Sequence, residues 1–121
     1  MKRDLIFDLG FHKGEDSELY LKKGFSVVAV KADPQLATQA ADRLRAYVES
    51  GQLTIVAKAI AREEGLVTFY RSENITIWGT IERAWADRNR HLGVRIREIA
   101  VPSIRFAQLI SEYGTPYYMK V

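Results

Sequence analysis

The residues whose types and spacing best suit chemistry lie in a glycine-rich turn, residues 8–14, which reads DLGFHKG. The turn follows a short apolar run at residues 5–7, expected to be a buried strand, and precedes a helix expected at residues 15–23. A glycine where a strand ends permits a tight turn with positive φ, and a glycine where a helix starts lets a ligand approach backbone N–H groups. This arrangement is typical of a nucleoside-cofactor turn, and it is equally compatible with a plain connection between strand and helix.

Other kinds of chemistry could use the same turn. The dinucleotide pattern G-x-G-x-x-G does not occur in the chain, and neither does the phosphate-loop pattern G-x-x-x-x-G-K-[ST]. His12 could act as a general base, but a histidine in such a turn is more often a local hydrogen-bonding group. Asp8, Glu15 and Asp16 could bind a metal ion; carboxylates at a helix start more often interact with the helix dipole, so we expect no metal site.

The segments that follow must position this turn. An apolar run at residues 27–30 predicts a second buried strand. Asp33 and Pro34 predict a helix that starts with an aspartate cap, and Gly51 predicts its end. A third strand is expected at residues 53–57. The order strand, helix, strand, helix, strand favours parallel strands joined by right-handed crossovers, which is the α/β class.

The pattern changes after residue 57, although no repeat or linker divides the chain, and residues 1–121 are expected to form a single domain. A turn at residues 63–65 and a β-rich run at residues 66–70 predict a strand that folds back. A polar helix is expected at 80–92, and its apolar side would carry Ile81, Ala84, Trp85 and Leu92. A strand is expected at 94–101 and a final strand at 117–121. Between these two strands we expect a helix capped by Ser103, and its inward face would carry Phe106, Leu109, Ile110 and Tyr113.

Composition and charge exclude several classes of protein. The chain has 121 residues, a formal charge of +3 and no cysteine, so it has neither a disulfide framework nor a cysteine nucleophile. The lack of cysteine fits a reducing compartment, and we expect a cytoplasmic location. No apolar run approaches the roughly 20 residues of a membrane span, so no membrane partner is expected. Arginines between Arg83 and Arg97 could bind nucleic acid, but the interleaved acidic residues favour a solvated surface instead.

An ordered series of motifs resembles one family. Residues 8–15, in the pattern Asp-x-Gly-x-x-x-Gly-Glu, and residues 28–34, VAVKADP, resemble the first two motifs of the FkbM-type S-adenosylmethionine-dependent methyltransferases. Residues 57–61 with residues 65–70 are similar to that family's third strand and its added hairpin. Residues 101–104 and 118–121 are similar to the approach to its fourth strand, so that the resemblance covers essentially the whole chain.

The resemblance implies a Rossmann-like, three-layer α/β fold with a mostly parallel sheet and an added β-hairpin. It also implies that S-adenosylmethionine binds where the parallel strands end, and that the sulfonium methyl group is transferred to a hydroxyl oxygen. Carried over to this chain, the resemblance implies that Asp8, Gly10 and Gly14 lie around the methionine and ribose portions of the cofactor. Backbone groups near Phe11 and His12 would contact its amino-acid tail. Ala59 and Ile60 would lie near its adenine.

Lys31 departs from the family, which has an acidic residue at the end of its second strand to accept hydrogen bonds from both ribose hydroxyls. An ammonium group accepts no hydrogen bond. Losing such bonds, at roughly 1.5–3 kcal/mol each, is expected to weaken cofactor binding by about ten- to a hundredfold or more. The favoured interpretation is that Lys31 disables the site; the alternative is that it favours a phosphorylated ribose, as in NADP sites.

The end of the chain also departs from the family, whose members continue with an Asp-x-Glu-Gly motif. The chain therefore resembles the N-terminal, cofactor-binding half of a class I methyltransferase, with weak binding and little or no turnover. The strand at residues 117–121 would then have an open edge, and we expect self-association, as a homodimer, through it. The alternative is a truncated or engineered Rossmann-like scaffold that self-associates without cofactor.

Overall fold

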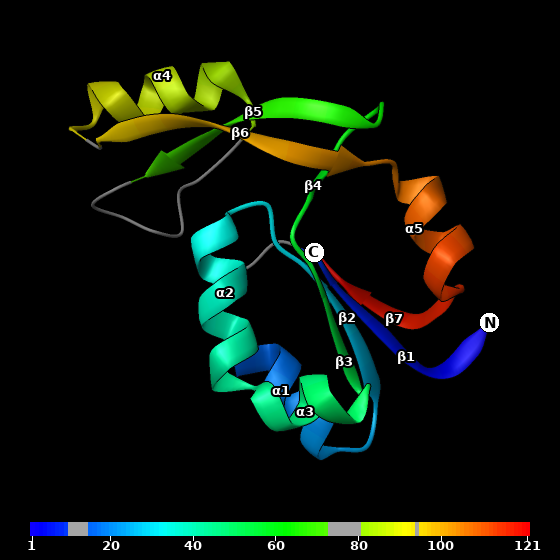
Figure 1. The fold of residues 1–121 in the computed structure, drawn as a ribbon. Helices are drawn as coiled ribbons and strands as arrows, with labels where there is room; N and C mark the ends of the chain where they lie inside the picture. The colour runs from blue at the N-terminus through cyan, green and yellow to red at the C-terminus, as the bar shows by residue number, and fades with distance from the viewer. Residues whose placement is uncertain (10–14, 73–80, 94) are drawn as a thin grey trace.

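The computed structural model describes residues 1–9, 15–72, 81–93 and 95–121 (Figure 1). Strands and helices alternate through the first half of the chain, as expected. In the second half, strands and helices alternate again from residue 65 to residue 120. The elements are β1 (Lys2–Leu9), α1 (Glu15–Lys22), β2 (Ser26–Val30), α2 (Pro34–Arg43), α3 (Arg45–Ser50), β3 (Leu53–Val56), β4 (Ala59–Ile60), β5 (Gly65–Ser72), α4 (Arg83–His91), β6 (Ile96–Ile104), α5 (Phe106–Tyr113) and β7 (Pro116–Lys120).

The larger sheet has four strands in the order β3-β2-β1-β7, and all neighbouring strands are parallel. The α/β class with a mostly parallel sheet is therefore confirmed, and the strand order is compatible with a Rossmann-like fold. The chain moves outward from β1 to β3 and then returns to the other side of β1 as β7. This reversal lies beside the end of β1, where Asp8 pairs in register with Ala29 on one side and Lys120 on the other.

Helices cover both faces of this sheet, which makes three layers (Figure 1). Alternate residues of a strand point to opposite faces. On one face Phe7 and Val28 pack with Leu109 of α5. On the other, Ile6 and Val27 pack with Leu21 near the end of α1. The central strands are apolar on both faces for this reason.

The smaller sheet has three strands in the order β4-β6-β5. β4 is parallel to β6, and β5 is antiparallel to β6 along its whole length, from Gly65 opposite Ser103 to Ser72 opposite Ile96. A strand that folds back at residues 65–72 is thus present, but its partner is the distant β6. The expected hairpin is corrected in this respect, because α4 lies between the two strands in the sequence.

Several helix boundaries follow from local chemistry. The Asp33 side chain accepts a hydrogen bond from the Gln35 backbone N–H at 2.9 Å, and Pro34 occupies the first turn of α2, so the predicted start is confirmed. The predicted single helix from Pro34 to Gly51 is instead divided at Leu44, whose φ of −110° is not helical. Leu44 is buried against the sheet, and packing of this side chain accompanies the break.

Two predictions about the second half were wrong. Ser103 does not cap a helix: it lies in β6, where its hydroxyl donates to the Glu63 carbonyl at 2.6 Å. In α4 the buried residues are Ala86 and Asn89, while Trp85 is 54% exposed with the Arg88 guanidinium over its ring. The buried side of α4 is therefore formed by Ala86 and Asn89, and Trp85 and Leu92 do not face the core. The predicted inward face of α5, in contrast, is confirmed.

The edge strand β7 contacts the larger sheet through β1 alone in the described sheet order. Tyr117, Tyr118 and Met119 are all exposed by more than a third. An apolar strand is therefore present at residues 116–120, but it is an exposed edge rather than a buried strand. No helix within the described residues is long and apolar enough to cross a membrane.

Candidate cofactor-binding site

Asp8 lies near the end of β1 and is the first residue of the glycine-rich turn defined above, and only 2% of its surface is exposed. Its Oδ2 accepts a hydrogen bond from the Ser17 hydroxyl in the first part of α1, at 2.6 Å. Its Oδ1 is also buried and has no hydrogen-bond partner among the described residues. A buried carboxylate oxygen without a donor is costly, so this atom is suited to accept a hydrogen bond from a ligand.

Lys31 directly follows β2, on the strand next to Asp8, and is 3% exposed. Burial lowers the pKa of its ammonium group to about 7, and the negative charge of Asp8 opposes this shift. The two side chains are therefore close enough to interact electrostatically. A lysine with this pKa exists at neutral pH as a mixture of ammonium, which only donates, and amine, which can also accept one hydrogen bond.

On the β7 side of Asp8, α1 contacts the edge strand through two pairs of side chains. The Lys120 ammonium forms an ion pair with Asp16. One turn farther along α1, the ring of Tyr20 meets that of Tyr118 edge-on, with centroids 6.2 Å apart. Burial, followed by the influence of Tyr118 and of the Asp8 charge, raises the pKa of Tyr20. The ends of β1, β2 and β7 thus bring acidic, basic and phenolic groups to one edge of the sheet.

The other predicted site residues are placed as follows. Gly10, Phe11, His12 and Gly14 lie outside the described residues. Ala59 is 2% exposed and packs with Phe69 and Val101 in the core of the smaller sheet, while Ile60 packs against the core of the larger one. The structure therefore brings Asp8 and Lys31 together, and a contact of residues 59–60 with an adenine remains a prediction.

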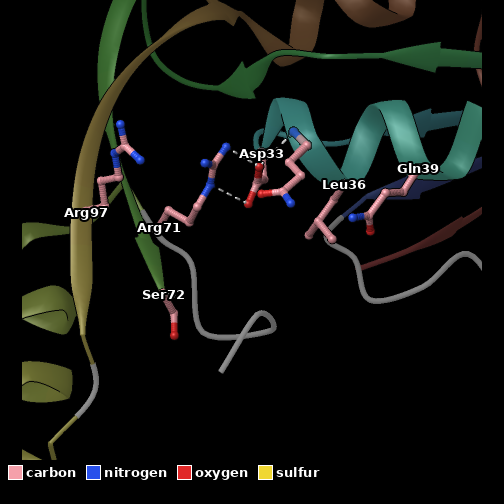
Figure 2. A pocket seen from close by; sticks show the side chains of 7 residues that line it. Asp33, Leu36, Gln39, Arg71, Ser72 and Arg97 are labelled. Carbon is pink, nitrogen blue, oxygen red and sulfur yellow. Dashed lines mark hydrogen bonds and ion pairs between the residues drawn. The ribbon is translucent and has the colours of Figure 1, made fainter. Parts of the chain in front are cut away.

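A second polar site was missed by sequence reasoning. It is a pocket of about 270 Å³ where α2 begins, against the β5–β6 pair (Figure 2). The Arg71 guanidinium donates from Nε and Nη2 to the two carboxylate oxygens of Asp33, at 3.1 and 2.8 Å. Nothing in the spacing of residues 33 and 71 indicates this contact, which depends on how the two sheets pack. The lining comprises Asp33, Gln35, Leu36, Gln39, Arg71, Ser72 and Arg97.

No protein-family model, no curated protein and no solved structure matched this chain. The candidate site is therefore defined by the buried Asp8 and Lys31 side chains and by their position at the carboxyl ends of the parallel strands β1 and β2.

Proposed function

We propose that the chain binds a nucleoside cofactor of the S-adenosylmethionine type at the carboxyl ends of β1 and β2, as the cofactor-binding half of an FkbM-like O-methyltransferase. The observation that carries the proposal is the Oδ1 atom of Asp8, which is buried and without a donor among the described residues. It lies at the end of β1, beside the point where the strand order reverses between β1 and β7. In open α/β sheets ligands bind outside the carboxyl ends of the strands at such a reversal.

In this proposal the residues have distinct roles. Asp8 accepts a hydrogen bond from the cofactor, and Ser17 holds its carboxylate in place from α1. The bound cofactor supplies a reactive sulfonium methyl group, and the protein supplies binding and orientation. Lys31 takes the position where the family has an acidic residue, and its charge is near that of Asp8. The ammonium form accepts no hydrogen bond from the ribose hydroxyls, and the amine form accepts only one, whereas a carboxylate accepts from both. Binding is therefore weak and turnover is low.

The test is calorimetry of the chain with S-adenosylmethionine and S-adenosylhomocysteine. Lys31→Gln and Lys31→Glu each restore a hydrogen-bond acceptor, and the glutamate variant is expected to bind about ten- to a hundredfold more tightly than the wild type. Asp8→Asn is expected to weaken binding. Arg62→Gln, a change at an exposed residue, is the control and leaves binding unchanged. Absence of heat with either ligand, in the wild type and in folded Lys31→Gln and Lys31→Glu, would overturn the proposal.

A second candidate function is binding of a phosphorylated ribose, as in NADP. The observation that favours it is Lys31, a buried basic side chain at the end of β2. A thermal-shift comparison separates the candidates, because a ligand at 100 times its dissociation constant stabilises the folded state by about 2.7 kcal/mol. Stabilisation by NADP but not by NAD or S-adenosylmethionine would favour this candidate. No stabilisation by any of them would favour a scaffold without cofactor.

A further inference from the structure

The pocket between α2 and the β5–β6 pair, which lies outside the residues assigned to the cofactor, has walls from two different elements. One wall is the first turns of α2, with Gln35, Leu36 and Gln39; the other is the ribbon of β5 and β6, with Arg71 and Arg97. Leu36 is the only apolar side chain among the described lining residues. A pocket lined in this way suits a polar ligand.

Two arginines stand directly opposite each other on this ribbon. Arg71 and Arg97 are register partners in the antiparallel pair β5–β6. Like charges at directly opposite positions destabilise a sheet. Asp33 compensates one of them through its two-point contact with Arg71. Arg97 forms no ion pair within the described parts of the chain, so the pocket keeps one positive charge in excess.

The donors that remain in the pocket come from both walls. A guanidinium has five N–H groups, and Arg71 uses two of them on Asp33, which leaves three. Arg97 adds the N–H groups of a second guanidinium, and the side-chain amides of Gln35 and Gln39 can donate hydrogen bonds from the α2 wall. Figure 2 shows Arg71 reaching toward the start of α2, with Gln39 farther along the helix.

The chemistry of these donors selects among anions. Guanidinium groups match carboxylate and phosphate oxygens. A carboxylate offers two oxygens in one plane, whereas a phosphate group offers three oxygens arranged around a tetrahedral centre. Donors that line two different walls of a pocket are better satisfied by the tetrahedral group than by a planar one. The volume of about 270 Å³ lies just below the roughly 300–1,000 Å³ of sites for drug-sized ligands, which indicates a small ligand.

We propose that this pocket binds the phosphate group of a small phosphomonoester, with Arg97 and the free N–H groups of Arg71 on one side and the Gln39 amide on the other. Asp33 acts as a positioning residue, because its carboxylate holds the Arg71 guanidinium at the pocket wall. The proposal goes beyond the cofactor site and depends on none of the residues assigned to it.

The experiment is calorimetry of the full chain with ribose 5-phosphate, with ribose and acetate at the same ionic strength as comparison ligands. We expect the phosphate ester to bind and the other two not to bind. Arg97→Gln removes the uncompensated charge at an exposed position and is expected to weaken binding by about tenfold or more. Gln39→Glu places a negative charge in the pocket at another exposed position and is expected to abolish binding.

Arg62→Gln is the matched control, since it removes one positive charge from an exposed arginine outside the pocket. It should leave binding within about twofold of the wild type at moderate salt, where distant charges are screened. The proposal is overturned if ribose 5-phosphate does not bind the folded wild type at millimolar concentration, if acetate binds as tightly, or if Arg97→Gln and Arg62→Gln weaken binding equally. It is independent of S-adenosylmethionine binding, which is measured separately.

Discussion

At Lys31, burial and charge act in opposite directions. Removal from water disfavours the ammonium form, and the nearby Asp8 carboxylate favours it, with burial the larger effect. The result is a lysine whose pKa of about 7 lies well below the ordinary value of 10.5. The sequence shows that a basic residue stands where the resembled family has an acidic one. It does not show that this residue is buried beside a carboxylate, which depends on the pairing of β1 with β2.

This burial predicts a pH dependence of stability. Between pH 7 and 10.5 the unfolded chain keeps the Lys31 proton and the folded chain loses it, so the free energy of unfolding rises with pH in this window. The slope from one such group is at most about 1.4 kcal/mol per pH unit, and it disappears below pH 7, where both states are protonated. In urea titrations at pH 7.5 and 9, the stability of the wild type relative to Lys31→Met should therefore increase by about 1 kcal/mol per pH unit.

The control for this measurement is Lys23→Met, which removes a lysine at an exposed position. Its stability should follow the wild type at both pH values. If the profile of Lys31→Met is instead parallel to that of the wild type, Lys31 does not titrate in this window.

At the scale of elements, the turn after α5 determines where β7 lies. Gly114 ends the helix with φ of 95° and ψ of 170°, and the backbone N–H of Lys2 then donates to the Thr115 carbonyl at 2.9 Å as β1 and β7 come together. A side chain at Gly114 would meet the end of the Lys2 side chain at 2.8 Å. The steric clash with Lys2 can be relieved because the lysine side chain is flexible. The backbone strain that a residue other than glycine would have at this φ and ψ cannot be relieved by moving a side chain. A helix end at this glycine was predictable; its contact with the first strand was not.

Gly114→Ala is therefore expected to destabilise the protein by about 1–3 kcal/mol, measured by chemical denaturation. The comparison is Gly51→Ala, at the end of α3, where φ is 81° and ψ is 1° and an added Cβ meets nothing within 4 Å. That backbone region is more accessible to residues other than glycine, so the loss should be smaller, about 1 kcal/mol. If the two variants lose the same free energy of unfolding, the backbone conformation at Gly114 requires glycine no more than that at Gly51 does.

At the scale of the whole molecule, the larger sheet has an unpaired edge at β7 within the described strand order. The strand carries exposed Tyr117, Tyr118 and Met119. Charge, proline or a bulge usually protects a natural edge strand from pairing with another chain. In β7 such features lie at the two ends: Pro116 starts the strand, where its pairing with β1 is irregular, and Lys120 ends it, paired with Asp16. The three exposed residues between them carry no charge. Unpaired N–H and C=O groups on such an edge can pair with the same strand of a second copy.

We predict that the chain self-associates through β7. Light scattering coupled to size-exclusion chromatography should show a mass that rises with protein concentration toward that of a dimer. Tyr117→Lys places a charge on an exposed position of the edge and should shift the protein toward monomer, whereas Leu66→Lys, at an exposed position of β5, should not. A wild type that stays strictly monomeric at high concentration would contradict this prediction.

The sequence by itself determined the elements whose signals are local. Apolar runs at residues 5–7 and 27–30 required buried strands, Asp33 and Pro34 began a helix, Gly51 ended one, and their order required parallel strands. Local signals suffice there because cap chemistry and backbone freedom act over a few residues. The glycine turn and Lys31 likewise indicated a candidate ligand site at one edge of the sheet, which stays a prediction.

Only the tertiary structure decided which distant groups meet. β5 pairs with β6, the strand that follows α4, rather than with the strand that precedes the turn at residues 63–65. The contact of Asp33 with Arg71 joins residues 38 positions apart, and no periodicity encodes such a separation. Burial of Lys31 beside Asp8 has the same origin. Pairing of β1 with β2 buries Lys31 beside Asp8, and packing of the smaller sheet against α2 brings Arg71 to Asp33. Removal from water changes the proton affinity of a charged group, and the position of a residue in the sequence does not reveal that change.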